Sequence, residues 1–168
     1  MAPHYPELNM SYQKLRAHME ALIAQHGMAV NPVMPSGKTP PFAYTIGQQP
    51  KGLPELIVFG LPPQVAGAML YTMAGFMEEE LAAGRQACAG FITVPEVPVR
   101  HALLEVPAAA ASEYATVAHD RSGGKATYLQ VVWPDESGLF PWEAGYEDEL
   151  RKYQLLLGAP PTPARVLH

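Results

Sequence analysis

Seven polar or aromatic side chains fall in three short segments whose composition suits binding or acid–base chemistry. They are Tyr44, Glu55, Gln130, Trp133, Asp135, Trp142 and Glu143. Asp135 and Glu143 could supply a carboxylate pair, since two carboxyls in unlike environments can divide the roles of general acid and general base. If their strands pair or lie side by side, Tyr44 and Gln130 would face one cleft roofed by the loop from Trp133 to Tyr146.

The same loop has a purely structural interpretation, which we favour. In Pro-Asp-Glu-Ser-Gly, the Asp135 carboxylate would accept hydrogen bonds from turn amides. Trp142 would close the edge of the core, and Glu143 would pair with an arginine such as Arg100. Under this hypothesis the loop is a rigid lock, and no ligand is needed to explain its aromatic and turn residues.

The common catalytic motifs are incomplete. Ser36-Gly37-Lys38-Thr39 resembles the end of a phosphate-binding loop, but Pro32 stands where the first glycine is required and Pro40-Pro41 prevents the helix that should follow. No serine lies in a Gly-x-Ser-x-Gly elbow. The sequence therefore predicts no catalytic residue and no nucleoside triphosphate site.

The histidines and the single cysteine give no recognisable metal motif. None of the six histidines lies at His-x-His, His-x3-His or His-Glu-x-x-His spacing, although the sequence leaves open whether His101 and His119 meet in space. Cys88 is alone, so no internal disulfide can form, and we expect it to pack as a small, inert, buried side chain. We predict no metal and no other cofactor.

Charge and hydropathy narrow the partner classes. The 168 residues carry 11 basic and 16 acidic side chains, for a formal charge of -5, and no Lys/Arg-rich stretch occurs. Nucleic-acid binding is therefore not expected, because it needs clustered cations. No window approaches about 18 uninterrupted apolar residues, and the first residues lack the pattern of a secretory signal. The expectation is a soluble, cytoplasmic protein that does not bind a membrane.

The helices and strands that must position these residues are predicted from the spacing of apolar residues, with Pro and Gly marking where elements end. Apolar residues at helical spacing predict a helix over 10–26, with Asn9 or Ser11 as its N-cap and Gly27 as its stop, and a longer helix over 64–83. Further helices are expected over 107–119 and 147–156. Branched and aromatic runs predict strands over 28–33, 42–46, 56–59, 90–94, 97–106 and 127–133.

This order does not alternate as a regular βα repeat, so the fold class predicted is α+β. We expect a single domain over residues 1–158, followed by a Pro-rich tail over 159–168. Its core would be a mostly antiparallel sheet of about five or six strands, with the long helix on one face and shorter helices at its flanks. The strand over 127–133 is nearly continuous in apolar residues, which predicts a central position with both faces covered.

Three motifs carry a family resemblance: Pro41-Phe-Ala-Tyr-Thr-Ile-Gly47, Leu53-Pro-Glu-Leu-Ile-Val-Phe-Gly-Leu61, and Leu129-Gln-Val-Val-Trp-Pro-Asp135 with Phe140-Pro-Trp-Glu-Ala-Gly-Tyr146. Together they resemble a bacterial family known as domain of unknown function 4262. The resemblance implies a small cytoplasmic bacterial protein and supplies no catalytic or binding residues. A second similarity, a Pro-Glu-Leu strand before a helix and a later Leu-Gln-Val strand, is to the suppressor-of-fused-like domains of bacterial toxin-immunity proteins.

Two functional hypotheses remain. The first is a non-enzymatic binding protein, such as an accessory, inhibitor or immunity-type factor, that meets a protein partner through an acidic, aromatic-bearing face. The alternative is a small-ligand domain or hydrolase with a cleft beneath the loop from Trp133 to Glu143. Met69, Met73 and Met77 lie at four-residue spacing and could line a partner groove, but core packing is the favoured interpretation. The sequence does not fix the oligomeric state.

Overall fold

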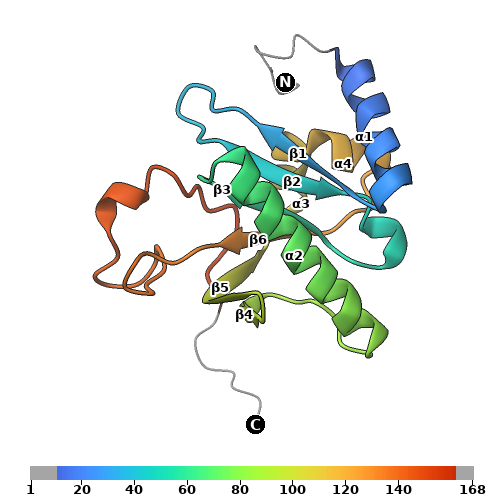
Figure 1. Cartoon of the computed structure of the whole chain (residues 1–168). Helices are drawn as coiled ribbons and strands as arrows, with labels where there is room; N and C mark the ends of the chain where they lie inside the picture. Colours follow the sequence, from blue (N-terminus) through green and yellow to red (C-terminus); the bar gives the residue numbers. More distant parts are fainter. Residues whose placement is uncertain (1–10, 162–168) are drawn as a thin grey trace.

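Six strands form one mixed sheet in the computed structural model, which describes residues 11–161 (Figure 1). The sheet order is β1-β2-β3-β6-β5-β4. The strands are β1 (Ala29–Val33), β2 (Phe42–Ile46), β3 (Glu55–Phe59), β4 (Gly90–Val94), β5 (Val97–Glu105) and β6 (Tyr128–Val132). Neighbouring strands are antiparallel except β3 and β6, which are parallel. The α+β class and the mostly antiparallel six-stranded sheet are therefore confirmed.

Helices cover both faces of this sheet. The four helices are α1 (Tyr12–His26), α2 (Pro63–Ala82), α3 (Ala108–Tyr114) and α4 (Thr116–Arg121), and two 3-10 turns are η1 (Gln49–Lys51) and η2 (Asp148–Leu150). Side chains alternate along β3, so Leu56 and Val58 pack under α2 whereas Ile57 and Phe59 pack with α1, α3 and α4. The predicted long helix on one face, with shorter helices elsewhere, is confirmed.

Local chemistry explains where the two longer helices begin and end. Ser11 accepts a hydrogen bond from the Lys14 amide at the start of α1, and Gly27 ends it with φ 85°. Pro62 and Pro63 begin α2, where a missing amide donor costs no intrahelical bond. On α2, Met73 and Met77 are buried against the sheet and Met69 is half-buried, in agreement with the core interpretation of this stripe. Among residues 11–161, no helix combines the length and apolarity needed to cross a membrane.

Tyr44 and Gln130 lie on the same face of one sheet. Ile57 of β3 pairs with Tyr44 of β2 on one side and with Gln130 of β6 on the other, so the three side chains form a row across the sheet. The expected shared sheet is present, and β6 is central with both faces buried, as predicted. Ile57, only 1% exposed, fills the position between the two polar residues.

Four expectations need correction. The helix predicted over 147–156 is wrong, since only η2 forms there and the backbone then runs on without regular structure. The helix predicted over 107–119 is two short helices, broken at Ala115 with ψ 56°. The strand predicted over 97–106 ends one residue earlier, and the strand predicted over 127–133 begins one residue later and ends one residue earlier. Cys88 is exposed, because its segment between α2 and β4 is an open coil.

The terminal boundaries are only partly described. Asn9, one of the two N-caps considered for the first helix, lies outside the described residues, as does most of the Pro-rich tail predicted over 159–168. The domain boundary after residue 158 therefore stays a prediction.

The Tyr44 hydroxyl supplies a direct test of this packing. It accepts hydrogen bonds from Asn31 Nδ2 at 2.8 Å and from the Val117 amide of α4 at 3.1 Å, and the residue is 0% exposed. In Tyr44→Phe the buried Val117 amide loses this acceptor, so we expect a loss of about 1–3 kcal/mol in the free energy of unfolding. Urea denaturation measures it. Tyr71→Phe, at a half-exposed tyrosine of α2, is the control and should leave stability unchanged; equal stabilities of both variants would contradict the role of this hydroxyl.

Candidate functional site

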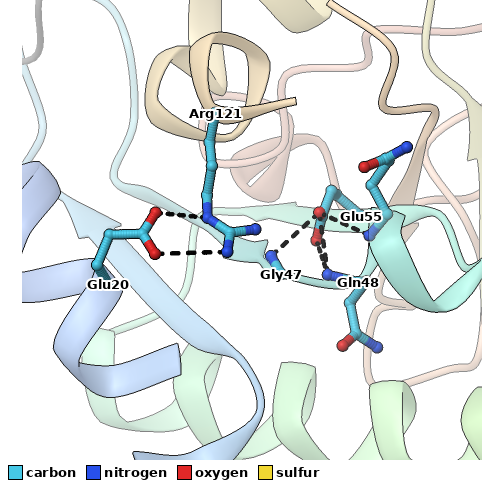
Figure 2. A network of polar contacts seen from close by, with 6 residues as sticks. Glu20, Gly47, Gln48, Glu55 and Arg121 are labelled. Atoms are coloured by element: carbon cyan, nitrogen blue, oxygen red, sulfur yellow. Dashed lines mark hydrogen bonds and ion pairs between the residues drawn. The ribbon is translucent and has the colours of Figure 1, made fainter. Parts of the chain in front are cut away.

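A buried carboxylate holds the loop between β2 and β3. Glu55 is 2% exposed, and it accepts a hydrogen bond from Thr45 Oγ1 at 2.9 Å. It also accepts hydrogen bonds from the backbone amides of Gly47, Gln48 and Gln49 at 3.1–3.2 Å (Figure 2). Successive amides that converge on one anion form a nest. Gly47 makes this turn possible because its φ of 108° lies in the region that favours glycine. Glu55 is therefore an anchor for the chain from Gly47 to Pro54.

The charge state of Glu55 reflects two opposing influences. Burial raises the pKa of its carboxyl above the ordinary value, whereas the hydrogen bonds from Thr45 and the three amides lower it, and burial prevails. All of its hydrogen-bond donors are neutral groups. The nearby ion pair between Glu20 of α1 and Arg121 of α4 is separate from this nest (Figure 2). Enclosed in this way, the carboxyl can fix backbone but has no route to a substrate.

A long non-regular segment, residues 133–158, follows β6 and returns across the sheet; we call it the C-terminal excursion. In Figure 1 it is the orange-to-red lobe that extends from β6 beside the sheet. Asp135 fixes its first turn, because the carboxylate accepts hydrogen bonds from the amides of Ser137 and Leu139 at 2.9 Å and of Glu147 at 3.1 Å. The Leu139 amide and its neighbours hold the pKa of Asp135 below its usual range.

Two buried glutamines fasten the returning half of the excursion. Gln154 pairs with the Trp133 backbone in both directions, donating to its carbonyl at 2.7 Å and accepting from its amide at 3.0 Å. Gln130 does the same one step further, donating to the Leu155 carbonyl at 2.6 Å and accepting from the Leu157 amide at 2.8 Å. Each glutamine side chain thus donates to one backbone carbonyl and accepts from one backbone amide, as the backbone of a paired strand would. The excursion is thus hydrogen-bonded back along β6.

Aromatic rings and one arginine gather where the excursion meets β4 and β5. The Trp142 ring stacks on Phe140 at 5.2 Å with an interplanar angle of 8°, and Phe140 lies 5.5 Å from Phe91. The Arg100 guanidinium lies over Phe91 at 4.3 Å and over Phe140 at 5.2 Å. Phe140 is buried against Ala102 and other residues of this end of the sheet, whereas Phe91 is 40% exposed. We call Phe91, Arg100, Phe140 and Trp142 the aromatic patch.

The residues singled out in the sequence thus fall into separate networks. Trp133, Asp135, Trp142 and Glu143 belong to the excursion, and Gln130 reaches it from β6. Tyr44 and Glu55 lie on other strands, and the structure gives neither a hydrogen bond to the excursion. Every one of the seven contacts other parts of the protein.

The structural details of the lock are mostly as expected. Asp135 does accept from turn amides, and Trp142 does pack at the edge of the core. The predicted pairing of Glu143 with Arg100 is wrong, since Glu143 accepts from the Phe140 amide at 3.4 Å and Arg100 lies over the rings. Trp133 also has a partner that the sequence did not indicate: its Nε1 donates to the Phe59 carbonyl at 2.8 Å.

Residues 22–147 match a family described as Domain of unknown function (DUF4262). The chain belongs to the DUF4262 family. The resemblance seen in the three sequence motifs is therefore confirmed. No curated protein and no solved structure matches the chain significantly. The matched region of the DUF4262 protein includes the Glu55 nest and the Asp135 turn, and it ends before Gln154.

Among residues 11–161 of the DUF4262 protein, no three His, Cys, Asp or Glu side chains are grouped as metal ligands would be. His101 is 3% exposed, its Nδ1 lies 2.8 Å from the Val99 carbonyl, and burial lowers its pKa. His119 lies on α4, next to Gly124. Sequence reasoning missed Phe91 and Gln154 and gave Arg100 the wrong partner, and none of the three stands in a recognisable motif.

Asp135→Asn tests whether the negative charge holds the excursion. Since the folded-state pKa of Asp135 is lowered, its ionised form adds stability above the ordinary Asp pKa of about 3.9, and this contribution disappears as pH falls through the folded-state value. We expect the variant to unfold at a lower temperature near neutral pH and the difference to narrow below pH ~4. Thermal melts across pH measure this. Glu136→Gln, at an exposed neighbour, should show neither effect; a constant difference at all pH values would refute the charge-based account.

Gly158→Ala tests the docking of the returning end. A Cβ at Gly158 would overlap the Glu105 carbonyl oxygen, and because the backbone there is not in the left-handed region, the clash alone sets the cost. We expect a loss of about 1–3 kcal/mol in the free energy of unfolding and faster hydrogen exchange at the Leu157 amide. Gly67→Ala is the matched control, since a Cβ there meets nothing within 4 Å, and it should not destabilise. Identical behaviour of the two variants would show that the excursion does not rest on β5.

Proposed function

We propose that this DUF4262 protein is a cytoplasmic bacterial binding protein without catalytic activity, which meets a protein partner through the aromatic patch. A role as accessory, inhibitor or immunity-type factor fits this proposal. The observation that carries it is the patch itself: an exposed phenylalanine, a half-buried tryptophan and an arginine, all in contact with the buried Phe140 ring. Trp, aromatic residues and Arg are the residue types that most often dominate the binding energy of protein interfaces.

The rigidity of the excursion supports this role. Its backbone amides donate to the Asp135 carboxylate, and other backbone groups pair with the side-chain amides of Gln154 and Gln130, so the patch is presented on a fixed backbone. A surface that is already ordered loses less conformational entropy when a partner binds. A loop lock and a recognition surface are thus compatible functions of one segment.

The charges around the patch indicate the kind of partner. The stretch from Trp133 to Leu150 contains no Lys or Arg, and its acidic residues are Asp135, Glu136, Glu143, Glu147, Asp148 and Glu149. Asp148 pairs with Arg151 and Glu149 lies near Lys152, which leaves Glu136 and Glu147 exposed and outside the ion pairs of the described residues. Acidic rims favour encounter with basic surfaces. The partner we infer is a protein with Lys or Arg around an apolar recess.

The alternative of a ligand cleft beneath the loop has less support. The side chains that would line it, those of Trp133 and Asp135, direct their polar atoms into hydrogen bonds with the protein's own backbone. Glu143 likewise accepts from a backbone amide. A hydrolase would need at least one of these groups available to a substrate.

The patch is tested by quantitative capture of partners from the host. We expect Trp142→Ala to weaken the complex by about 2 kcal/mol, or roughly 30-fold in Kd, as for a central interface residue. Arg100→Gln, at an exposed position, should weaken it while leaving the melting temperature unchanged. Tyr71→Ala on α2, which covers the other face of the sheet, is the control and should bind like the unmodified protein. The proposal fails if no partner is retained, or if all three variants retain it equally.

A further inference from the structure

A hollow of about 600 Å³ opens at the end of the sheet where β3 and β6 begin. Its lining comes from several separate parts of the chain, including Leu53, Cys88, Glu105, Lys125 and Tyr128. The excursion leaves β6 from the other end, after Val132, so the hollow and the aromatic patch are separate surfaces. The volume is typical of pockets that hold small molecules.

The Glu55 nest holds one wall of this hollow. Gln49, Gly52, Leu53 and Pro54 all line it, and Gln49 donates its amide hydrogen to the Glu55 carboxylate. The loop that bears these residues is therefore tied to a buried side chain. Such an anchor explains why the protein keeps a carboxyl in its interior at a considerable desolvation cost.

The remaining lining combines an apolar floor with two opposite charges. Leu53 and Leu129 are buried residues that contribute to the floor, together with the half-buried Leu81. Glu105 ends β5 and Lys125 precedes β6, both exposed, and neither belongs to an ion pair among the described residues. A ligand with one cationic group, one anionic group and aliphatic carbon would complement all three features of the lining.

We propose that this hollow binds a short apolar peptide with free termini. Its ammonium group would lie towards Glu105, its carboxylate towards Lys125, and its aliphatic side chains on the leucine floor. Glu55 acts as a positioning residue, since it fixes the wall without touching the ligand. This inference does not depend on the proposed protein partner, because it concerns the opposite end of β6.

Cys88 provides a reporter, since it is the sole cysteine of the chain, is exposed and lines the hollow. The experiment measures how far a probe slows alkylation of Cys88 by iodoacetamide, with backbone amide chemical shifts of Gln49 and Ala126 as a second readout. Four probes share the leucyl-leucine core and differ in which terminus is charged: leucyl-leucine, its N-acetyl derivative, its C-terminal amide, and the doubly blocked peptide. We expect leucyl-leucine to bind most tightly, by about tenfold over either singly blocked form, as for the loss of one charged hydrogen bond.

Two exposed-residue variants separate the two charges. Lys125→Gln should abolish the advantage of leucyl-leucine over its C-terminal amide and keep its advantage over the N-acetyl form. Glu105→Gln should do the reverse. Equal binding of all four probes would overturn the zwitterion assignment and leave an apolar surface only. If no probe slows the alkylation of Cys88 or changes the amide chemical shifts of Gln49 and Ala126, the binding site itself is overturned.

Discussion

The burial of β3 and β6 on both faces is the constraint on which this structure depends. A polar side chain in a doubly covered strand has no access to water, so it must find its partners inside the protein. Glu55 and Gln130 are such side chains, and both bond to backbone that is neither helix nor strand. The central strands therefore determine the course of the connections around them as well as the core.

This arrangement accounts for the long excursion after β6. Ordering backbone outside helices and strands costs about 1–2 kcal/mol per residue in conformational entropy, and here no ladder of regular hydrogen bonds offsets it. Side chains supply the missing hydrogen-bond partners of this backbone. Asp135 bonds to the first turn of the excursion, and Gln154 and Gln130 bond to backbone where the excursion returns to β6. Phe140 and Leu156 add apolar burial against β5 and β6. The outcome is a defined surface with Trp142 and Arg100 in contact with the same ring.

Much of the fold was predictable, because it depends on the spacing of apolar residues and on the positions of capping residues, Pro and Gly. Ser11 and Gly27 bound α1, and the apolar run of β6 indicated its central position. The helix expected over 147–156 does not form because, after η2, the backbone groups of Leu155 and Leu157 bond to the Gln130 side chain and not within a helix. The site was predictable only in part. Asp135 and Trp142 stood out by their turn and aromatic context, whereas Arg100 and Gln154 act through contacts between residues distant in sequence, which no local pattern records.

The close contact between Gly158 and the Glu105 carbonyl joins two regions that otherwise lie apart. Glu105 is the last residue of β5; it is one of the residues that line the hollow, and its carbonyl lies against the returning end of the excursion. Any event that shifts this residue alters both surroundings at once. Ligand binding that displaced Glu105 at one region would change affinity at the other, and by thermodynamic linkage the factor would be the same in both directions. A glycine with no room for a methyl group is thus the point at which the end of β5 and the returning segment meet.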